Sequence, residues 1–189
     1  MLKRLILPIM LLSVLFIAPL ATAAVDTSPQ TNKTVIQSEE AGTPKVEYNL
    51  PYPGIGPDHP LYVLKAARDW LLDKLIVDPV RKVEFYILQG DKRLQMGINL
   101  IVKNKNTLAE QVVSKGEKYQ VKAVAALAAL KKSGTLIPGY LLDRLENSLA
   151  KHVEVLEEQI AKAGGPEKFG LQGSLELVKQ LQAEVVKLK

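Results

Sequence analysis

Residues 79–102 read PVRKVEFYILQGDKRLQMGINLIV, and this stretch predicts the architecture of the chain. Apolar residues recur every seven positions along it, and a companion row carries two glycines; the rows are Val80, Ile87, Leu94 and Ile101, and Val83, Gly90 and Gly97. Such a seam is typical of a helix packed nearly parallel or antiparallel to others. Each interior glycine costs a helix about 1 kcal/mol relative to alanine. We therefore expect a neighbouring helix to approach closely at these glycines, with a ligand groove there as the alternative.

The flanks of this stretch set the boundaries of two helices. Asp78-Pro79 ends a short preceding helix that begins near Pro60, because the residue before a proline avoids the helical conformation. Asp78 is also a good N-cap for the next helix, which we expect to reach about Lys103, with Pro79 in its first turn. Asp58 or His59 is the expected cap of the short helix.

Glycine and proline also bound the later helices. The expected elements are a third helix over residues 107–132 that stops at Ser133-Gly134, a fourth from Pro138 to the Gly164-Gly165-Pro166 stop, a connector with Phe169, and a fifth from Gly173 or Ser174. No alternating strand pattern of useful length follows the leader. The sequence therefore predicts an all-α fold, a helical bundle of about four long helices plus a short leading helix.

The first residues are typical of a secretory signal. Two cations, Lys3 and Arg4, precede an apolar run that contains two prolines, and small residues close it. This order predicts cleavage near Ala23 or Ala24 and export to the periplasm, cell wall or medium. The run is shorter than the roughly 20 unbroken apolar residues of a stable anchor, so we expect no transmembrane anchor after cleavage. An uncleaved anchor is the alternative.

The composition divides the chain into three parts. We expect a signal peptide over residues 1–24, a disordered Thr/Ser-rich linker over 25–49 and a helical domain over 50–189, with an internal boundary near 134–138 as an option. The chain has no cysteine, so a packed core must supply its stability. Cleavage removes two cations and lowers the formal net charge from +5 to +3.

No motif of known chemistry is present in the sequence. The chain has two histidines, His59 and His152, and the Glu-x-x-His pair of di-iron bundles would need glutamate where Leu149 stands. We interpret His152 as a core or edge histidine and His59 as a cap or surface residue. No serine lies in a Gly-x-Ser-x-Gly elbow, and no phosphate-binding loop is found. We expect no enzyme activity, no metal and no cofactor.

Two groups of cations are the only candidate binding residues. They are Lys92, Arg93, Lys115, Lys118 and Lys122. The last three share one helix face and could meet an anionic polymer or a headgroup surface, although acidic residues between them also suit an ordinary charged surface. Export and the scarcity of aromatic residues argue against nucleic acid as a partner.

One segment resembles a known family. Residues 53–65, PGIGPDHPLYVLK, with residues 78–84, DPVRKVE, are similar to bacterial exported domains of unknown function with a Pro-Gly-x-x-Pro-Asp-x-Pro-Leu-Tyr-x-Leu-Lys motif. His59 stands where that family has a small polar residue. The resemblance implies an exported, helical, envelope-associated protein and supplies no catalytic residue.

The residues of this motif have a structural interpretation. They are Pro57, Asp58, Pro60, Leu61, Tyr62, Leu64, Asp78 and Pro79. We expect Leu61, Tyr62 and Leu64 to dock the first helix on the bundle as core residues, and Tyr52 and Ile55 to pack on the domain.

Three functions compete at this point. The leading hypothesis is a non-enzymatic interaction or structural module of the cell envelope, whose partner is unknown and could be an envelope protein. The second is a binder of anionic envelope material through the lysine-rich faces. The third is a small-ligand carrier or chaperone-like protein with a cavity near Gly90 and Gly97.

Overall fold

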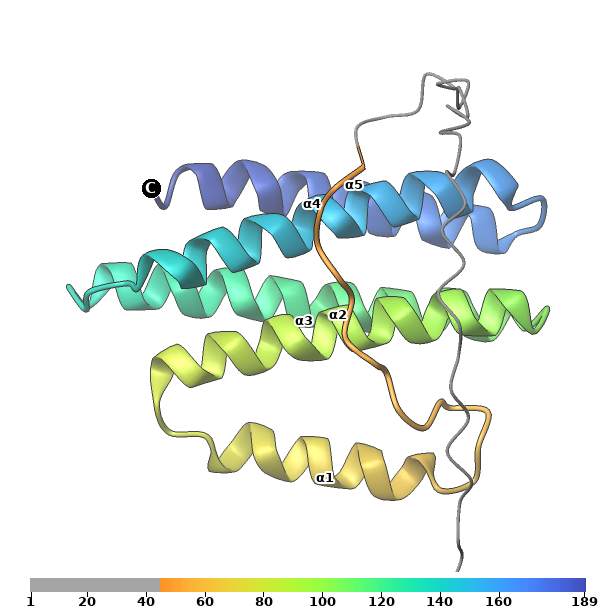
Figure 1. Ribbon diagram of the computed structural model, residues 1–189, viewed down its shortest axis with the longest axis horizontal. Helices are drawn as coiled ribbons and strands as arrows, with labels where there is room; N and C mark the ends of the chain where they lie inside the picture. The colour runs from red at the N-terminus through yellow and green to blue at the C-terminus, as the bar shows by residue number, and fades with distance from the viewer. Residues whose placement is uncertain (1–44) are drawn as a thin grey trace, which may run out of the picture. The chain divides into compact units, whose positions relative to one another are not determined.

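The computed structural model describes residues 45–189, which hold five helices and no strand (Figure 1). The helices are α1 (Tyr62–Leu75), α2 (Pro79–Val102), α3 (Asn106–Lys132), α4 (Gly139–Lys162) and α5 (Glu167–Val186). The predicted all-α fold, with four long helices after a short one, is confirmed. The predicted signal peptide and most of the predicted linker lie outside the described residues. None of the five helices has the length and apolarity needed to cross a bilayer.

Helices α2 to α5 form a four-helix bundle. Helix α2 packs against α3 and α4, and α5 packs against the same two helices. In cross-section α3 and α4 therefore occupy opposite corners of the bundle, as do α2 and α5. One core cluster draws buried side chains from all four helices, including Ile87, Leu127, Leu149 and Val178. Because this cluster contains residues on both sides of 134–138, no domain boundary lies there.

The α2–α3 pair is the closest in the bundle, and glycines make it so. A Cβ atom on Gly97 would lie 2.3 Å from Cγ2 of Val113, and one on Gly90 would lie 2.6 Å from Nε2 of Gln120. Gly116 of α3 faces the backbone of α2 in the same way, since a Cβ atom on it would lie 3.2 Å from the Gly90 carbonyl oxygen. The predicted close approach is confirmed, and the predicted cavity at these glycines is wrong, because Gln120 and Val113 fill the space.

The N-cap of α2 follows the sequence prediction. Asp78 accepts a hydrogen bond from the Arg81 N–H at 2.8 Å, with Pro79 as the first helical residue. Of the two candidates at the start of α1, His59 accepts a hydrogen bond from the Leu61 N–H at its Nδ1, at 3.2 Å, although the N-cap position itself is Leu61. Asp58 does not cap α1. It pairs instead with Lys103 and Lys105, each at 3.0 Å, in the turn between α2 and α3. Hydrogen bonds from these two lysines lower the pKa of Asp58 to about 2.

Helix α5 begins six residues earlier than predicted. The chain becomes helical at Glu167, directly after Pro166, so Phe169 lies on the exposed surface of a helix rather than in a connector. Gly170 is accommodated in the first turns because it sits against Glu110, where a Cβ atom would lie 2.3 Å from the carboxylate oxygen.

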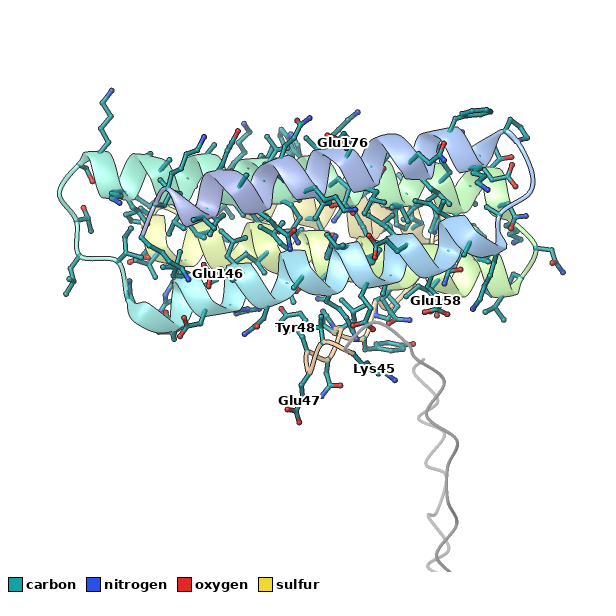
Figure 2. The ribbon with its side chains drawn as sticks, turned by 90° about the horizontal axis from the view of Figure 1, so that it is seen from above. Lys45, Glu47, Tyr48, Glu146, Glu158 and Glu176 are labelled. Atoms are coloured by element: carbon teal, nitrogen blue, oxygen red, sulfur yellow. The ribbon has the colours of Figure 1, made fainter. Side chains whose placement is uncertain are left out.

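Residues 45–53, which we call the strap, cross the bundle in an extended conformation (Figure 1). The Val46 N–H donates to Glu154 of α4 at 2.6 Å, and Lys151 donates to the Val46 carbonyl oxygen at 3.1 Å. In Figure 2, Glu47 points away from the bundle. Leu50 packs on the core cluster. The ordered domain therefore begins at least five residues before the predicted boundary at residue 50.

The glycine packing predicts opposite effects for two glycine-to-alanine changes. Gly97→Ala should lower the free energy of unfolding by about 1–2 kcal/mol, because a clash with buried Val113 outweighs the better helix propensity of alanine. Gly173→Ala, in α5 with no atom within 4 Å of the added Cβ, should raise it by up to about 1 kcal/mol. Denaturant unfolding of both variants checks this. A Gly97→Ala variant at least as stable as the parent would contradict the close packing.

Candidate functional site

Helix α1 lies on the bundle with its polar side inward. Lys65, Asp69 and Asp73 are spaced four residues apart and share one face. Asp69 is the only buried residue of α1, with 2% of its surface exposed. The Lys65 ammonium donates to two carbonyl oxygens of the segment before the helix, those of Pro53 and Ile55.

Asp73 fixes the rotation of α1 against α2 and α3. Its carboxylate lies 3.0 Å from Nζ of Lys82 on α2 and 3.4 Å from Nζ of Lys122 on α3. Lys82 also donates to the Asp73 carbonyl oxygen. Desolvation raises the pKa of Asp73, but hydrogen bonds from Lys82 and Tyr86 outweigh it, so the pKa is lowered. A charged carboxylate at this position ties α1 to both neighbours.

The apolar side of α1 consequently faces outward. The large exposed apolar side chains of α1 and of Leu61 just before it are 38–73% exposed: Leu61, Val63, Leu64, Trp70, Leu71, Leu72 and Leu75. The prediction that Leu61 and Leu64 are core residues is therefore wrong; of the three docking residues, only Tyr62 packs inward, beside Met96 and Leu100. Tyr52 and Ile55 are exposed as well and do not pack on the domain. We call this surface the α1 outward face.

The charge on the α1 outward face has one sign. Both acidic residues of α1 are turned inward, so the exposed charged side chains of the helix are Arg68 and Lys74. Val77, in the connection to α2, extends the apolar surface and is 89% exposed. An apolar surface of this kind beside cations is a candidate interaction site in a folded domain.

The five predicted cations do not form one patch. Arg93 is 8% exposed, its guanidinium lies 4.2 Å from the centre of the Tyr119 ring, and it donates to Gln89. Lys122 is tied to Asp73 and lies over the Tyr119 ring. Arg93 is thus a buried contact, which contradicts its predicted place on a binding surface, whereas the side chain of Lys122 is still 48% exposed although it is paired.

The other three predicted cations border α1. Lys115 and Lys118 precede Lys122 by two turns and one turn of α3, on the face that meets α1, and both are exposed. Lys92 lies on α2 beside Lys65 and Arg68 in one surface pocket. The surviving lysines thus extend the positive rim of the α1 outward face.

A second polar cluster lies inside the bundle and joins three helices. The ring of His152 on α4 stands between two carboxylates: Nδ1 is 2.8 Å from Glu117 of α3, and Nε2 is 3.2 Å from Asp91 of α2. Ser148 donates to Asp91 at 2.5 Å, and Tyr48 of the strap donates to its other oxygen at 2.7 Å. Figure 2 shows where the strap residue Tyr48 meets the bundle. Apart from Tyr48, these side chains are fully buried.

The two carboxylates keep the buried imidazole charged. Desolvation lowers the pKa of His152, but the charge of Glu117 and the hydrogen bonds that the ring donates to both carboxylates outweigh it, and the pKa rises to about 9. Burial and the neighbouring Asp91 likewise raise the pKa of the Tyr48 hydroxyl, which stays a donor. The prediction that His152 is a core histidine is confirmed.

The cluster is arranged for structure. Asp91 and Glu117 contact opposite nitrogens of the ring, so their oxygens do not converge on one point, and residues 45–189 contain no group of three ligating side chains around a metal position. The Ser148 hydroxyl donates to Asp91 and not to His152. His152, Ser148 and Tyr48 thus place their polar atoms against the two carboxylates, and these contacts link α2, α3 and α4.

Sequence reasoning missed this cluster for an identifiable reason. Asp91 and Glu117 each stand directly before a lysine in the sequence, a pattern that is typical of an ordinary charged surface. The available signal was spacing. Asp91 lies one position after Gly90 of the seam, and Glu117 one position after Gly116, so both sit at the close α2–α3 crossing.

Removing one carboxylate from the buried cluster should be costly. Glu117→Gln leaves a buried imidazolium with one charged partner, and we expect the free energy of unfolding at pH 7 to fall by about 3–5 kcal/mol. Glu176→Gln, on the exposed surface of α5, is the matched control and should change it by less than about 0.5 kcal/mol. Equal stability of the two variants would contradict the buried ion pair.

The same pair predicts a defined pH dependence. The pKa of His152 is raised from 6.5 to about 9 in the folded state, so its stabilising contribution is complete below pH 6.5 and is lost as the pH rises through 9. The stability difference between the parent and Glu117→Gln should therefore be largest below pH 6.5 and shrink towards pH 9. Lys65, whose pKa burial lowers to about 8, has the opposite effect but cancels in this difference. A difference that is constant from pH 6 to 10 would show that His152 is neutral.

The chain matches no family model, no curated protein and no solved structure. The resemblance of residues 53–65 and 78–84 to exported bacterial domains therefore stays a prediction, and the function must be argued from the geometry of the described residues.

Proposed function

We propose that the exported domain is a non-enzymatic interaction module of the cell envelope that attaches peripherally to an anionic membrane surface through the α1 outward face. One observation carries the proposal. Helix α1 turns its polar side to the bundle and exposes Leu64, Trp70 and Leu71. A helix that only completed the core would do the reverse.

The combination of apolar and positive groups supports a lipid surface as the partner. Helices that lie in a membrane interface expose tryptophan and leucine on one side with lysine and arginine beside them. Arg68 and Lys74 on α1, with Lys115 and Lys118 on α3, supply the cations here. Each cation close to an anionic leaflet contributes about 1 kcal/mol of attraction. This unites the interaction-module hypothesis with the hypothesis of binding to anionic envelope material.

A second copy of the chain suits the face less well. A two-fold symmetric dimer would bring the same patch of both copies together. The Arg68 and Lys74 side chains of both copies would then lie in one interface, and the α1 outward face has no exposed carboxylate of its own to neutralise them. An anionic bilayer provides both the apolar medium and the missing charge.

Binding should depend on the apolar residues of α1. We expect the mature chain to sediment with vesicles of phosphatidylcholine and phosphatidylglycerol but not with phosphatidylcholine alone. Leu64→Glu with Leu71→Glu should weaken that binding at least about tenfold, because two side chains lose their apolar burial and add negative charge. Leu136→Glu, at a leucine that is more exposed than either but lies in the α3–α4 connection, is the control and should bind like the parent.

Stability measurements accompany this test. Since Leu61 and Leu64 are exposed, Leu61→Ala and Leu64→Ala should change the free energy of unfolding by less than about 0.5 kcal/mol. Failure of the parent chain to bind anionic vesicles at low salt would overturn the proposal. If the double variant with Leu64→Glu and Leu71→Glu still binds, and this binding disappears at high salt, then the lysine-rich faces alone are responsible for the binding.

A further inference from the structure

A surface pocket of about 290 Å³ lies where α1, α2 and the segment before α1 meet. Its charged lining consists of Lys65 and Arg68 from α1 and Lys92 from α2, and Tyr52 stands at its edge. No acidic side chain lines it. Three cations from two helices and one neighbouring aromatic ring thus surround one solvent-filled space.

The segment before α1 shapes this pocket around Lys65. Gly54 adopts a left-handed conformation, with φ of +70°, which glycine tolerates without strain. The turn brings the carbonyl oxygens of Pro53 and Ile55 to the Lys65 ammonium, at 2.5 and 3.1 Å. These two bonds hold the ammonium in place, and its next nearest partner is the Met96 sulfur at 4.0 Å.

The positive charge of the pocket is only partly neutralised. Arg68 directs Nε and Nη2 to the same oxygen of Asp69, which leaves Nη1 without a protein partner among the described residues. Lys92 forms no ion pair within residues 45–189. Counting Lys65, Arg68, Lys92 and Asp69, the group carries a net charge of +2. Burial lowers the pKa of Lys65 to about 8, and although Asp69 raises it, Arg93, Lys92 and Arg68 lower it further.

The pocket adjoins the α1 outward face. Arg68 lies four residues after Leu64 and three before Leu71, so these side chains are neighbours on the helix surface. A phospholipid whose acyl chains meet Leu64 and Leu71 would carry its phosphate at the level of Arg68. Guanidinium and ammonium groups are the side chains that bind phosphate oxygens most strongly.

The geometry points to this pocket as a phosphate site, in which Arg68 and Lys92 bind the headgroup phosphate of a lipid that the α1 outward face contacts. Lys65, held by the Pro53 and Ile55 carbonyl oxygens, adds positive charge at the base of the site. The inference rests on the proposed attachment of α1 to a membrane. It adds that the attachment includes one defined headgroup contact besides general attraction to negative charge.

The test compares a lysine inside the pocket with one outside it. In vesicles of phosphatidylcholine and phosphatidylglycerol, Lys92→Gln should weaken binding of the mature chain about 10–100-fold, as expected for loss of a charged hydrogen bond. Lys118→Gln removes the same charge from the rim and should weaken it less than about fivefold. Arg68→Gln repeats the comparison at an exposed side chain, and its unfolding curve is measured alongside, because Arg68 also pairs with buried Asp69.

The outcomes separate this inference from the function on which it rests. If the parent binds anionic vesicles and Lys92→Gln, Arg68→Gln and Lys118→Gln are equally impaired, the phosphate site is overturned while the membrane function stands. If the parent does not bind vesicles, the membrane function fails. A titration with inorganic phosphate at constant ionic strength tests whether the pocket binds a soluble phosphate compound instead of a lipid. Saturable shifts of the Arg68 and Lys92 NMR signals, together with unimpaired vesicle binding by Lys92→Gln, would assign the pocket to a soluble phosphate compound and overturn the lipid assignment.

Discussion

The contact of Asp73 with Lys82 and Lys122 decides which surface this protein shows to its surroundings. An amphipathic helix beside a bundle ordinarily buries its apolar stripe. In α1 the ion pairs hold the opposite side inward, and they do so from two different helices. The exposed position of Leu64, Trp70 and Leu71 follows from that rotation. The proposed attachment to a membrane and the phosphate pocket beside Arg68 both follow from it as well.

The bundle that carries α1 depends on a second set of charges. His152, with its pKa raised to about 9, stands between Glu117 and Asp91 and aligns three helices, while Tyr48 joins the strap to the same carboxylate. A buried ion pair of this kind adds little net stability but penalises every other alignment, because each one leaves a buried charge without a partner. The close α2–α3 approach at Gly90 and Gly97 places these groups within reach of each other. A rigid support is what a single exposed helix needs in order to present a fixed face.

The sequence predicts the helices that pack their apolar side into the core. It does not predict the orientation of α1, whose polar side faces the bundle. The seven-residue seam, the Asp78-Pro79 boundary and the glycine crossing were all predictable, because local pattern and packing agree there. Leu61 and Leu64 were misassigned, because apolar spacing reveals a stripe but not whether it faces the core. The predicted start of α5 is too late because Gly170 and Gly173 are typical of a loop in the sequence. In the structure Gly170 is helical, and its missing side chain leaves room for Glu110. The buried cluster escaped prediction because Asp91 and Glu117 each stand beside a lysine in the sequence, as residues of a charged surface do.

The environment of Trp70 tests the central claim most directly, because it is the only tryptophan in the chain and lies in α1. With 63% of its surface exposed, it should emit at long wavelength in the free protein and be quenched efficiently by iodide. Vesicles containing phosphatidylglycerol should shift the emission to shorter wavelength and protect it from iodide, and phosphatidylcholine vesicles should do neither. A Trp70 already shielded in the free protein would contradict the outward orientation of α1. An exposed Trp70 that anionic vesicles leave unchanged would contradict the membrane surface as its partner.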